Sequence, residues 1–180
     1  MGKPENPAPV STLGGAADFF VQHTQPGYLD ACYECAPPRI QAALVDEVEF
    51  FRQVLDGSGR ALELGCGNGR LLEALGASAR QWVGVDFLAA YLRDARARRR
   101  LAPSTTLAAA QAGQLPFADA AFDVVIRAQN TLGLLGEQKL PTVQEAVRVT
   151  RPGGGRCSCS ILSFLWCRAQ SGTCRCTGGD

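Results

Sequence analysis

The sequence has almost no net charge of either sign. Its 180 residues carry 18 Lys and Arg against 17 Asp and Glu, which gives a formal net charge of +1. Domains that bind nucleic acid through its phosphates normally carry a marked excess of basic residues. We therefore expect no nucleic-acid partner.

Long apolar runs are also missing. The longest, residues 161–167, spans seven residues and contains Ser163, whereas a transmembrane helix needs about 18 or more apolar residues. The first twenty residues hold three prolines and no apolar core of a signal peptide, and Asn6 stands where a myristoylation signal has Ser or Thr. These features predict a cytoplasmic protein with no membrane partner.

Histidine occurs once, at His23, whereas there are eight cysteines. A structural zinc site needs four ligands from Cys or His. Cys32 and Cys35 form a single CxxC, two later pairs are spaced CxC, and no histidine lies next to any pair. We expect reduced, unpaired thiols and no metal site.

The length and the apolar content favour one compact domain, since 46% of the residues are hydrophobic and 19% are charged. Composition and pattern divide the chain into four parts. We predict a flexible tail at 1–15, an N-terminal helical cap at 16–57, a core at 58–163 and an irregular Cys- and Gly-rich tail at 164–180.

Hydrophobic periodicity predicts alternating helices and strands. Apolar residues at three- and four-residue steps indicate a helix from Ile40 to Leu55, which Gly57 would end. After it, short apolar runs alternate with mixed segments, which is typical of a parallel, doubly wound α/β sheet that binds ligands at the carboxyl ends of its strands. The predicted strands are 60–64, 82–85, 105–109, 122–126 and 156–162, and the predicted helices are 70–75, 88–99 and 141–149.

A glycine-rich turn follows the first predicted strand, in the segment ELGCGNG of residues 63–69. Gly65, Gly67 and Gly69 let the backbone pass close beneath a flat ligand. The spacing differs from the GxGxxG of nicotinamide sites, and no Gly-Lys-Ser/Thr of a P-loop follows. Glu63 at the strand end favours a ligand with an ammonium group over a phosphate. The alternative is a tight strand-to-helix turn without a ligand.

The second predicted strand ends in a carboxylate, Asp86, 23 residues after Glu63. An acidic residue about 20 positions beyond a glycine-rich turn commonly binds the ribose hydroxyls of a nucleoside. Together the turn and Asp86 predict a nucleoside site. Asp86 as a simple cap of the following helix is the alternative.

These motifs resemble those of the class I S-adenosylmethionine-dependent methyltransferases, in particular the small-molecule type that includes enzymes of ubiquinone and menaquinone biosynthesis. ELGCGNG and GVD at 84–86 are similar to the first two motifs of the family, and QLPF at 114–117 with FDVV at 122–125 and RVTRPGG at 148–154 is similar to later ones. The resemblance implies a Rossmann-like three-layer sandwich with a mainly parallel sheet, S-adenosylmethionine as cofactor and a small-molecule acceptor. The cofactor-binding residues it implies are Glu63, Gly65, Cys66, Gly67, Asn68, Gly69, Asp86, Phe87, Gln111, Ala112 and Arg127.

The sequence departs from the family in two places. Gln111 and Ala112 stand where the family has Asp-Ala at the adenine, and a Gln side chain still hydrogen-bonds an adenine edge. About twenty residues follow the fifth predicted strand, so we expect strands 6 and 7 to be missing and the chain to be a truncated or alternatively processed product. An apolar sheet edge at 160–165 then favours self-association. The alternative function is a catalytically silent cofactor-binding or interaction protein.

Methyl transfer by in-line displacement needs positioning more than it needs a metal. Candidates near the transfer point follow the fourth strand at Arg127, Gln129 and Asn130. From the cap, His23 is a candidate general base; the alternative is that it is an incidental histidine in a loop. Tyr28 and Tyr33 are candidates to close over the donor, and the alternative for them is ordinary helix packing. The arginines at 93–100 are interpreted as a solvated helix face rather than an RNA or acidic-substrate contact.

Overall fold

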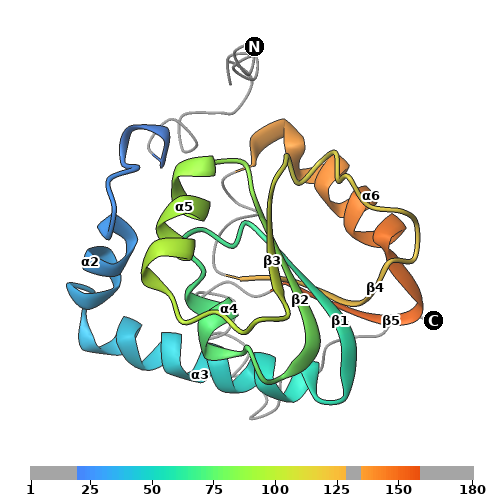
Figure 1. The fold of residues 1–180 in the computed structure, drawn as a ribbon, viewed down its shortest axis with the longest axis horizontal. Coiled ribbons are helices and arrows are strands. Elements are labelled where there is room, and N and C mark those ends of the chain that lie inside the picture. Colours follow the sequence, from blue (N-terminus) through green and yellow to red (C-terminus); the bar gives the residue numbers. More distant parts are fainter. Residues whose placement is uncertain (1–19, 129–134, 159–180) are drawn as a thin grey trace.

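The structure, a computed structural model, describes residues 20–128 and 135–158. The elements are α2 (Tyr28–Glu34), α3 (Pro38–Leu55), β1 (Ser58–Leu64), α4 (Arg70–Ala74), β2 (Ala79–Asp86), α5 (Ala89–Arg98), β3 (Thr105–Ala109), β4 (Phe122–Arg127), the 3₁₀ turn η1 (Gly136–Gln138), α6 (Lys139–Val149) and β5 (Thr150–Ser158). Strands and helices alternate through most of the core, although residues 110–121 join the third and fourth strands without a helix, and α2 and α3 precede the core (Figure 1).

The sheet has five strands in the order β3-β2-β1-β4-β5, and all its pairings are parallel. From β1 the chain winds outward through β2 and β3, then returns to place β4 on the other side of β1. Parallel sheets of this kind bind ligands in a crevice beyond the carboxyl ends of the strands, at the point where the strand order reverses. In this strand order that point lies between β1 and β4, and the glycine-rich turn leaves β1 there.

Both faces of the sheet are covered, as parallel sheets require. Helices α3, α4 and α5 lie on one face and α6 lies on the other (Figure 1). Alternate residues of β1 separate the two halves of the core: Ala61 packs with Phe51 and Trp82, whereas Leu62 packs with Val149 on the side of α6. The Rossmann-like three-layer sandwich is confirmed.

Two of the sequence motifs meet in space beside α6. The Arg148 guanidinium donates to the carbonyl oxygens of Phe117 at 2.8 Å and Leu115 at 3.2 Å. The Leu115 N–H in turn donates to Glu145 Oε2 at 2.6 Å. This network fixes the QLPF segment against the helix that precedes β5.

The predicted helices are confirmed to within about two residues, and β3 begins and ends as predicted. The fifth strand is the exception, because it begins at Thr150 and not at residue 156. A shift in the pairing with β4 between Phe122 and Val124, together with Gly153 at φ 77°, lets the Pro-Gly-Gly segment lie within the strand. Turn residues in the sequence here mark an irregularity of the strand rather than its start.

Several predicted features lie outside the described residues: the tail at 1–15, Gln129 and Asn130, the apolar edge at 160–165 and the tail at 164–180. No helix of the described residues is long and apolar enough to cross a membrane.

Gly154→Ala tests the irregular start of β5. A Cβ at Gly154 would lie 2.6 Å from the Asp123 carbonyl oxygen and 2.9 Å from that of Arg151, so the backbone must shift. We expect a loss of about 2 kcal/mol in the free energy of unfolding, measured by urea denaturation. Gly155→Ala is the control, because its Cβ would meet only Val124, at an ordinary 3.6 Å. Equal losses in the two variants would contradict this account of the strand.

Candidate functional site

The glycine-rich turn is pinned to the end of β2. The N–H groups of Gly65 and Cys66 donate to the Val85 carbonyl oxygen at 2.8 and 3.0 Å. Gly65, Gly67 and Gly69 have φ values of 72°, 52° and 77°, which residues with a Cβ rarely adopt. The three glycines are therefore required by the backbone conformation of the turn itself.

Asp86 joins this turn to the start of α5. Its Oδ2 accepts the Gly67 N–H at 2.9 Å, and its Oδ1 accepts the Leu88 N–H at 2.9 Å. Leu88 itself is the N-cap residue of α5 and has no side-chain cap bond, so Asp86 bridges two turns and does not cap the helix. Burial raises the pKa of Asp86, and the Leu88 and Gly67 N–H groups oppose the shift. The Phe87 N–H also lowers the pKa of Asp86 by hydrogen bonding. A carboxylate has about four acceptor positions, so acceptor capacity remains for another donor.

Glu63, on β1 next to the turn, is a buried carboxyl group with an unused oxygen. The residue is 3% exposed, and its Oε2 has no hydrogen-bond partner among the described residues. Burial raises the pKa of Glu63 to about 8, the charge of Arg70 acts in the opposite direction, and Glu47 and Asp86 add to the increase. A cation placed beside Glu63 would favour its ionised form.

An ion pair that the sequence did not predict joins α3 to α4, close enough to Glu63 for both of its charges to act on that residue. Arg70, the first residue of α4, donates to Glu47 Oε2 from α3, and Glu47 is 1% exposed. The Arg70 guanidinium carbon also lies 5.2 Å from the centroid of the Tyr33 ring. Glu47 falls in the apolar periodicity of α3, and a charged residue at such a position was the signal that could have revealed it.

Helix α2 lies against the glycine-rich turn. Asn68 donates through Nδ2 to Asp30 Oδ1 at 2.9 Å, and a Cβ at Gly67 would lie 3.1 Å from Leu29 Cδ1. Asp30 also pairs with Arg99, whose Nε donates to the Asn68 carbonyl oxygen at 3.1 Å. The cap thus holds the outer side of the turn.

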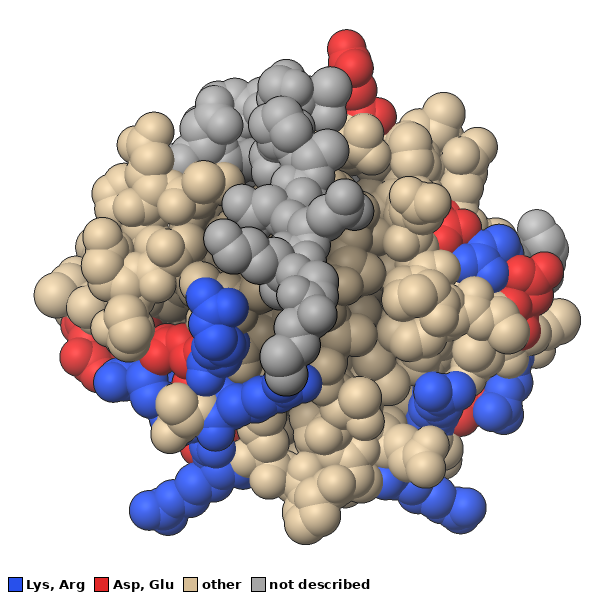
Figure 2. Space-filling view, turned by 45° about the horizontal axis from the view of Figure 1, so that its top comes forward, with Lys and Arg blue, Asp and Glu red and all other residues tan. Residues whose placement is uncertain are grey.

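The interpretation of residues 93–100 as a solvated face is wrong for Arg99. Its side chain is 16% exposed, because it pairs with Asp30 and Glu73. Arg93 and Arg100 are exposed, as predicted. In the space-filling view, basic and acidic side chains lie interleaved on the left of the face, as such pairing produces (Figure 2).

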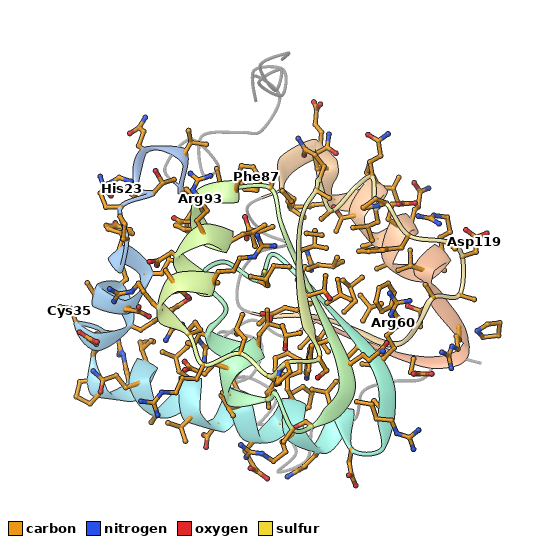
Figure 3. The ribbon with its side chains drawn as sticks, viewed as in Figure 1. His23, Cys35, Arg60, Phe87, Arg93 and Asp119 are labelled. Carbon is orange, nitrogen blue, oxygen red and sulfur yellow. The ribbon has the colours of Figure 1, made fainter. Side chains whose placement is uncertain are left out.

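The predicted adenine-side residues lie together beyond β2 and β3. The Ala110 N–H donates to the Asp86 carbonyl oxygen at 3.1 Å, so the chain after β3 runs past the end of β2. Gln111 is exposed on this stretch, and Ala112 is half-buried. Phe87 is half-buried and lies at the same end of the molecule as the start of α5 (Figure 3).

Arg127 and His23 are the described candidates for the transfer point. Arg127 ends β4, one residue beyond the Ile126 that pairs with Glu63; it is 6% exposed, and burial lowers its pKa to about 10. The His23 ring lies 4.8 Å from the Tyr28 ring, and the His23 carbonyl oxygen accepts the Tyr91 hydroxyl at 2.9 Å. His23 belongs to the cap and lies at the same end of the molecule as Phe87 (Figure 3).

Two predicted binding residues turn their side chains away from the crevice. Asn68 faces Asp30, as described, and Cys66 packs into the core, where burial raises the pKa of its thiol. The Cys66 Sγ occupies space that Gly84 leaves open, since a Cβ at Gly84 would lie 2.9 Å from it. Their backbones also take part in holding the turn, since the Cys66 carbonyl oxygen accepts the Gly69 N–H at 2.9 Å and the Asn68 carbonyl oxygen accepts Arg99 Nε at 3.1 Å.

Cys32 and Cys35 are free, exposed thiols on the cap. Within the part of the chain that the structure describes, no three His, Cys, Asp or Glu side chains are grouped so that they could hold a metal ion.

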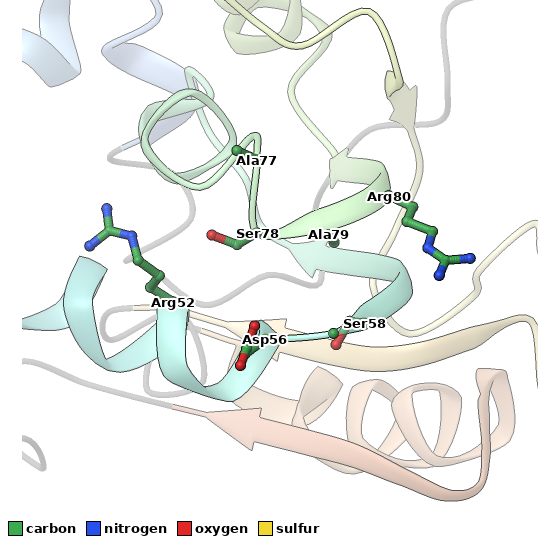
Figure 4. A pocket seen from close by; sticks show the side chains of 8 residues that line it. Arg52, Asp56, Ser58, Ala77, Ser78, Ala79 and Arg80 are labelled. Atoms are coloured by element: carbon green, nitrogen blue, oxygen red, sulfur yellow. The ribbon is translucent and has the colours of Figure 1, made fainter.

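A separate hollow of about 440 Å³ lies at the opposite end of the sheet, where β1 and β2 begin (Figure 4). Its two arginines point away from each other, and Arg52 is engaged with Glu49 at 2.5 Å. None of the predicted site residues borders it. The lining residues are Arg52, Asp56, Gly57, Ser58, Ala77, Ser78, Ala79 and Arg80.

Comparison with known proteins agrees with this geometry. A family model described as "Methyltransferase domain" matches residues 61–154, just over half of the chain. A "Probable S-adenosylmethionine-dependent methyltransferase" of Mycolicibacterium smegmatis is 30% identical over 155 residues, which cover 86% of this chain and 53% of that protein. The chain therefore spans about half the length of this relative.

Two solved structures are similar in fold. N-methyltransferase NodS from Bradyrhizobium japonicum WM9, in complex with S-adenosylhomocysteine, has a TM-score of 0.62 and 19% identity over 77% of this chain and 69% of that one. The [4+2]-cyclase SpnF has a TM-score of 0.54 and 30% identity over 62% of this chain and 42% of that one. With the family model matched from β1 into β5, the chain belongs to the class I S-adenosylmethionine-dependent methyltransferases.

Proposed function

We propose that this chain binds S-adenosylmethionine at the carboxyl edge of β1 and β2 and transfers the methyl group to a small-molecule acceptor. The observation that carries the proposal is Glu63, a buried carboxyl group with an unused oxygen beside a turn that only glycines form. The ammonium group of the cofactor supplies the cation that such a carboxylate needs.

Each end of the cofactor has a counterpart in the proposed site. Glu63 holds the amino-acid end, and Asp86 offers its remaining acceptor positions to the ribose hydroxyls. Phe87, Gln111 and Ala112 border the adenine. Gly65, Gly67 and Gly69 let the backbone approach, while Cys66 and Asn68 belong to this turn with side chains that face the core and the cap.

The acceptor side is formed by β4 and the cap. A sulfonium bound here would supply the reactivity, because its methyl group can pass to the acceptor by in-line displacement with S-adenosylhomocysteine as the leaving group. The protein has to hold the methyl group and the acceptor atom in line, and positioning of this kind can lower the barrier of a bimolecular reaction substantially. Arg127 borders the transfer point from β4. His23 is our candidate to remove a proton from the acceptor.

A second function, cofactor binding without methyl transfer, is favoured by one observation. β5 is an edge strand of the described sheet, and it pairs only with β4 among the described strands. An open edge favours self-association. A dimer that binds S-adenosylhomocysteine but methylates nothing in an acceptor screen would favour this reading.

Loss of the Asp86 carboxylate should weaken cofactor binding. We expect Asp86→Ala to raise the Kd of S-adenosylhomocysteine at least fivefold in isothermal titration, because each lost hydrogen bond costs about 1 kcal/mol. Asp56→Ala, at the opposite end of the sheet, is the control and should bind as the wild type does. Circular dichroism establishes that both variants are folded. Unchanged binding of S-adenosylhomocysteine by folded Asp86→Ala would show that Asp86 does not bind the ribose.

Binding should also depend on pH through Glu63. With its pKa raised to about 8, Glu63 carries a proton in the free protein at pH 6.5. An ammonium group beside it favours the carboxylate, so binding releases that proton, and the affinity for S-adenosylhomocysteine should rise up to about tenfold per pH unit between pH 5.5 and 7.5.

Titration in two buffers of different ionisation enthalpy measures the proton released. Glu63→Gln should abolish most of both the release and the pH dependence. A flat profile in the wild-type protein would show that the ammonium group does not bind at Glu63.

A further inference from the structure

Three charged side chains from different elements form a buried group at the amino-acid end of the proposed site. Glu63 of β1 and Glu47 of α3 are 3% and 1% exposed, and the Arg70 side chain of α4 is 18% exposed. Arg70 donates to Glu47, while Glu63 Oε2 accepts no hydrogen bond from a described residue. Two buried carboxyl groups therefore share one guanidinium group.

With both carboxyl groups ionised, this group would lack one positive charge. A buried carboxylate without a cation is costly, which is why the pKa of Glu63 is raised to about 8. Arg70 lies close enough to Glu63 to act on its charge, and the Asp86 carboxylate and the Cys66 thiol also interact with Glu63 electrostatically. One added ammonium group would balance the charges, because the two carboxylates of Glu47 and Glu63 would then face two cations, Arg70 and the ammonium group of the ligand.

We propose that Glu47 is a positioning residue for cofactor binding: it holds the Arg70 guanidinium on α3 and so keeps the Glu63 carboxylate available for the ammonium group of the cofactor. The inference rests on the proposed function and adds a residue from outside the glycine-rich turn. Tyr33, whose ring lies 5.2 Å from the guanidinium carbon, helps to hold Arg70 in place.

Without Glu47, the guanidinium would turn to Glu63, on whose charge it already acts. Arginine and the ligand would then compete for one carboxylate, and Glu63 would already be ionised in the free protein. The effect should be confined to ligands that carry an amino group.

The binding of two different ligands to a Glu47 variant distinguishes this positioning role from a merely structural one. S-adenosylhomocysteine carries the amino-acid end, whereas 5'-methylthioadenosine has the same nucleoside without it. For Glu47→Gln we expect the Kd of S-adenosylhomocysteine to rise about tenfold, the loss of one charge-assisted hydrogen bond. The Kd of 5'-methylthioadenosine should stay within about twofold, and proton release on binding S-adenosylhomocysteine should disappear.

The chain offers a matched control in Glu49→Gln. Glu49 lies on the same helix but is exposed, and it pairs with Arg52 at the surface. Neither ligand should bind this variant differently from the wild type.

A double variant, Glu47→Gln with Arg70→Gln, tests the competition directly and removes the buried pair together if Glu47→Gln alone does not fold. With no guanidinium to capture Glu63, the preference for S-adenosylhomocysteine over 5'-methylthioadenosine should return to within about threefold of the wild-type value.

The inference would be overturned if Glu47→Gln weakened the binding of both ligands equally, or if the double variant did not recover the preference for S-adenosylhomocysteine. A folded wild-type protein that binds neither ligand would overturn the proposed cofactor site itself. The two failures are therefore distinguishable.

Discussion

The attachment of the glycine-rich turn to the end of β2 is the constraint on which the site depends. The Val85 carbonyl oxygen receives two N–H groups from the turn, and Asp86 receives a third. Because β1 and β2 are parallel neighbours, both strands end at the same edge of the sheet. The turn cannot move without breaking these bonds, so the backbone is arranged for a ligand before one arrives, which lowers the ordering cost of binding.

Two ion pairs tie the cap to this edge. Asp30 and Glu47 come from α2 and α3, and their cationic partners, Arg99 and Arg70, flank the glycine-rich turn on the core side. A protein of nearly neutral net charge thus concentrates paired charges around one turn. Partly buried pairs of this kind are screened by salt much less than exposed ones. These pairs add to the apolar contact that α3 makes with the core through Phe51 and Leu55.

Local patterns in the sequence were sufficient to predict the fold and the part of the candidate site that lies around the glycine-rich turn. The periodicity of residues 40–55 and the apolar runs predicted α3 and the first four strands, because each signal lies within one element. Glu63, the glycines and Asp86 were recognisable since their spacing along the chain reflects a single strand-turn-helix unit. The Glu47–Arg70 and Asp30–Arg99 pairs join residues 23 and 69 positions apart. No local pattern encodes which distant charge a residue will meet, and β5 was misplaced for a related reason, since its register depends on β4.

The small side chain of Cys66 and the missing side chain of Gly84 have a shared consequence. Sγ and the site of the absent Cβ occupy one volume between β2 and the turn, and Leu72 and Leu107 close it from the other sides. The two positions therefore compete for space: the Cys66 side chain fits only while 84 stays glycine, and a side chain at 84 would need room at Leu72 as well as at 66, because its Cβ would lie 2.5 Å from Leu72 Cδ1. Across homologous sequences, the combined bulk at the two sites should vary less than the bulk at either one.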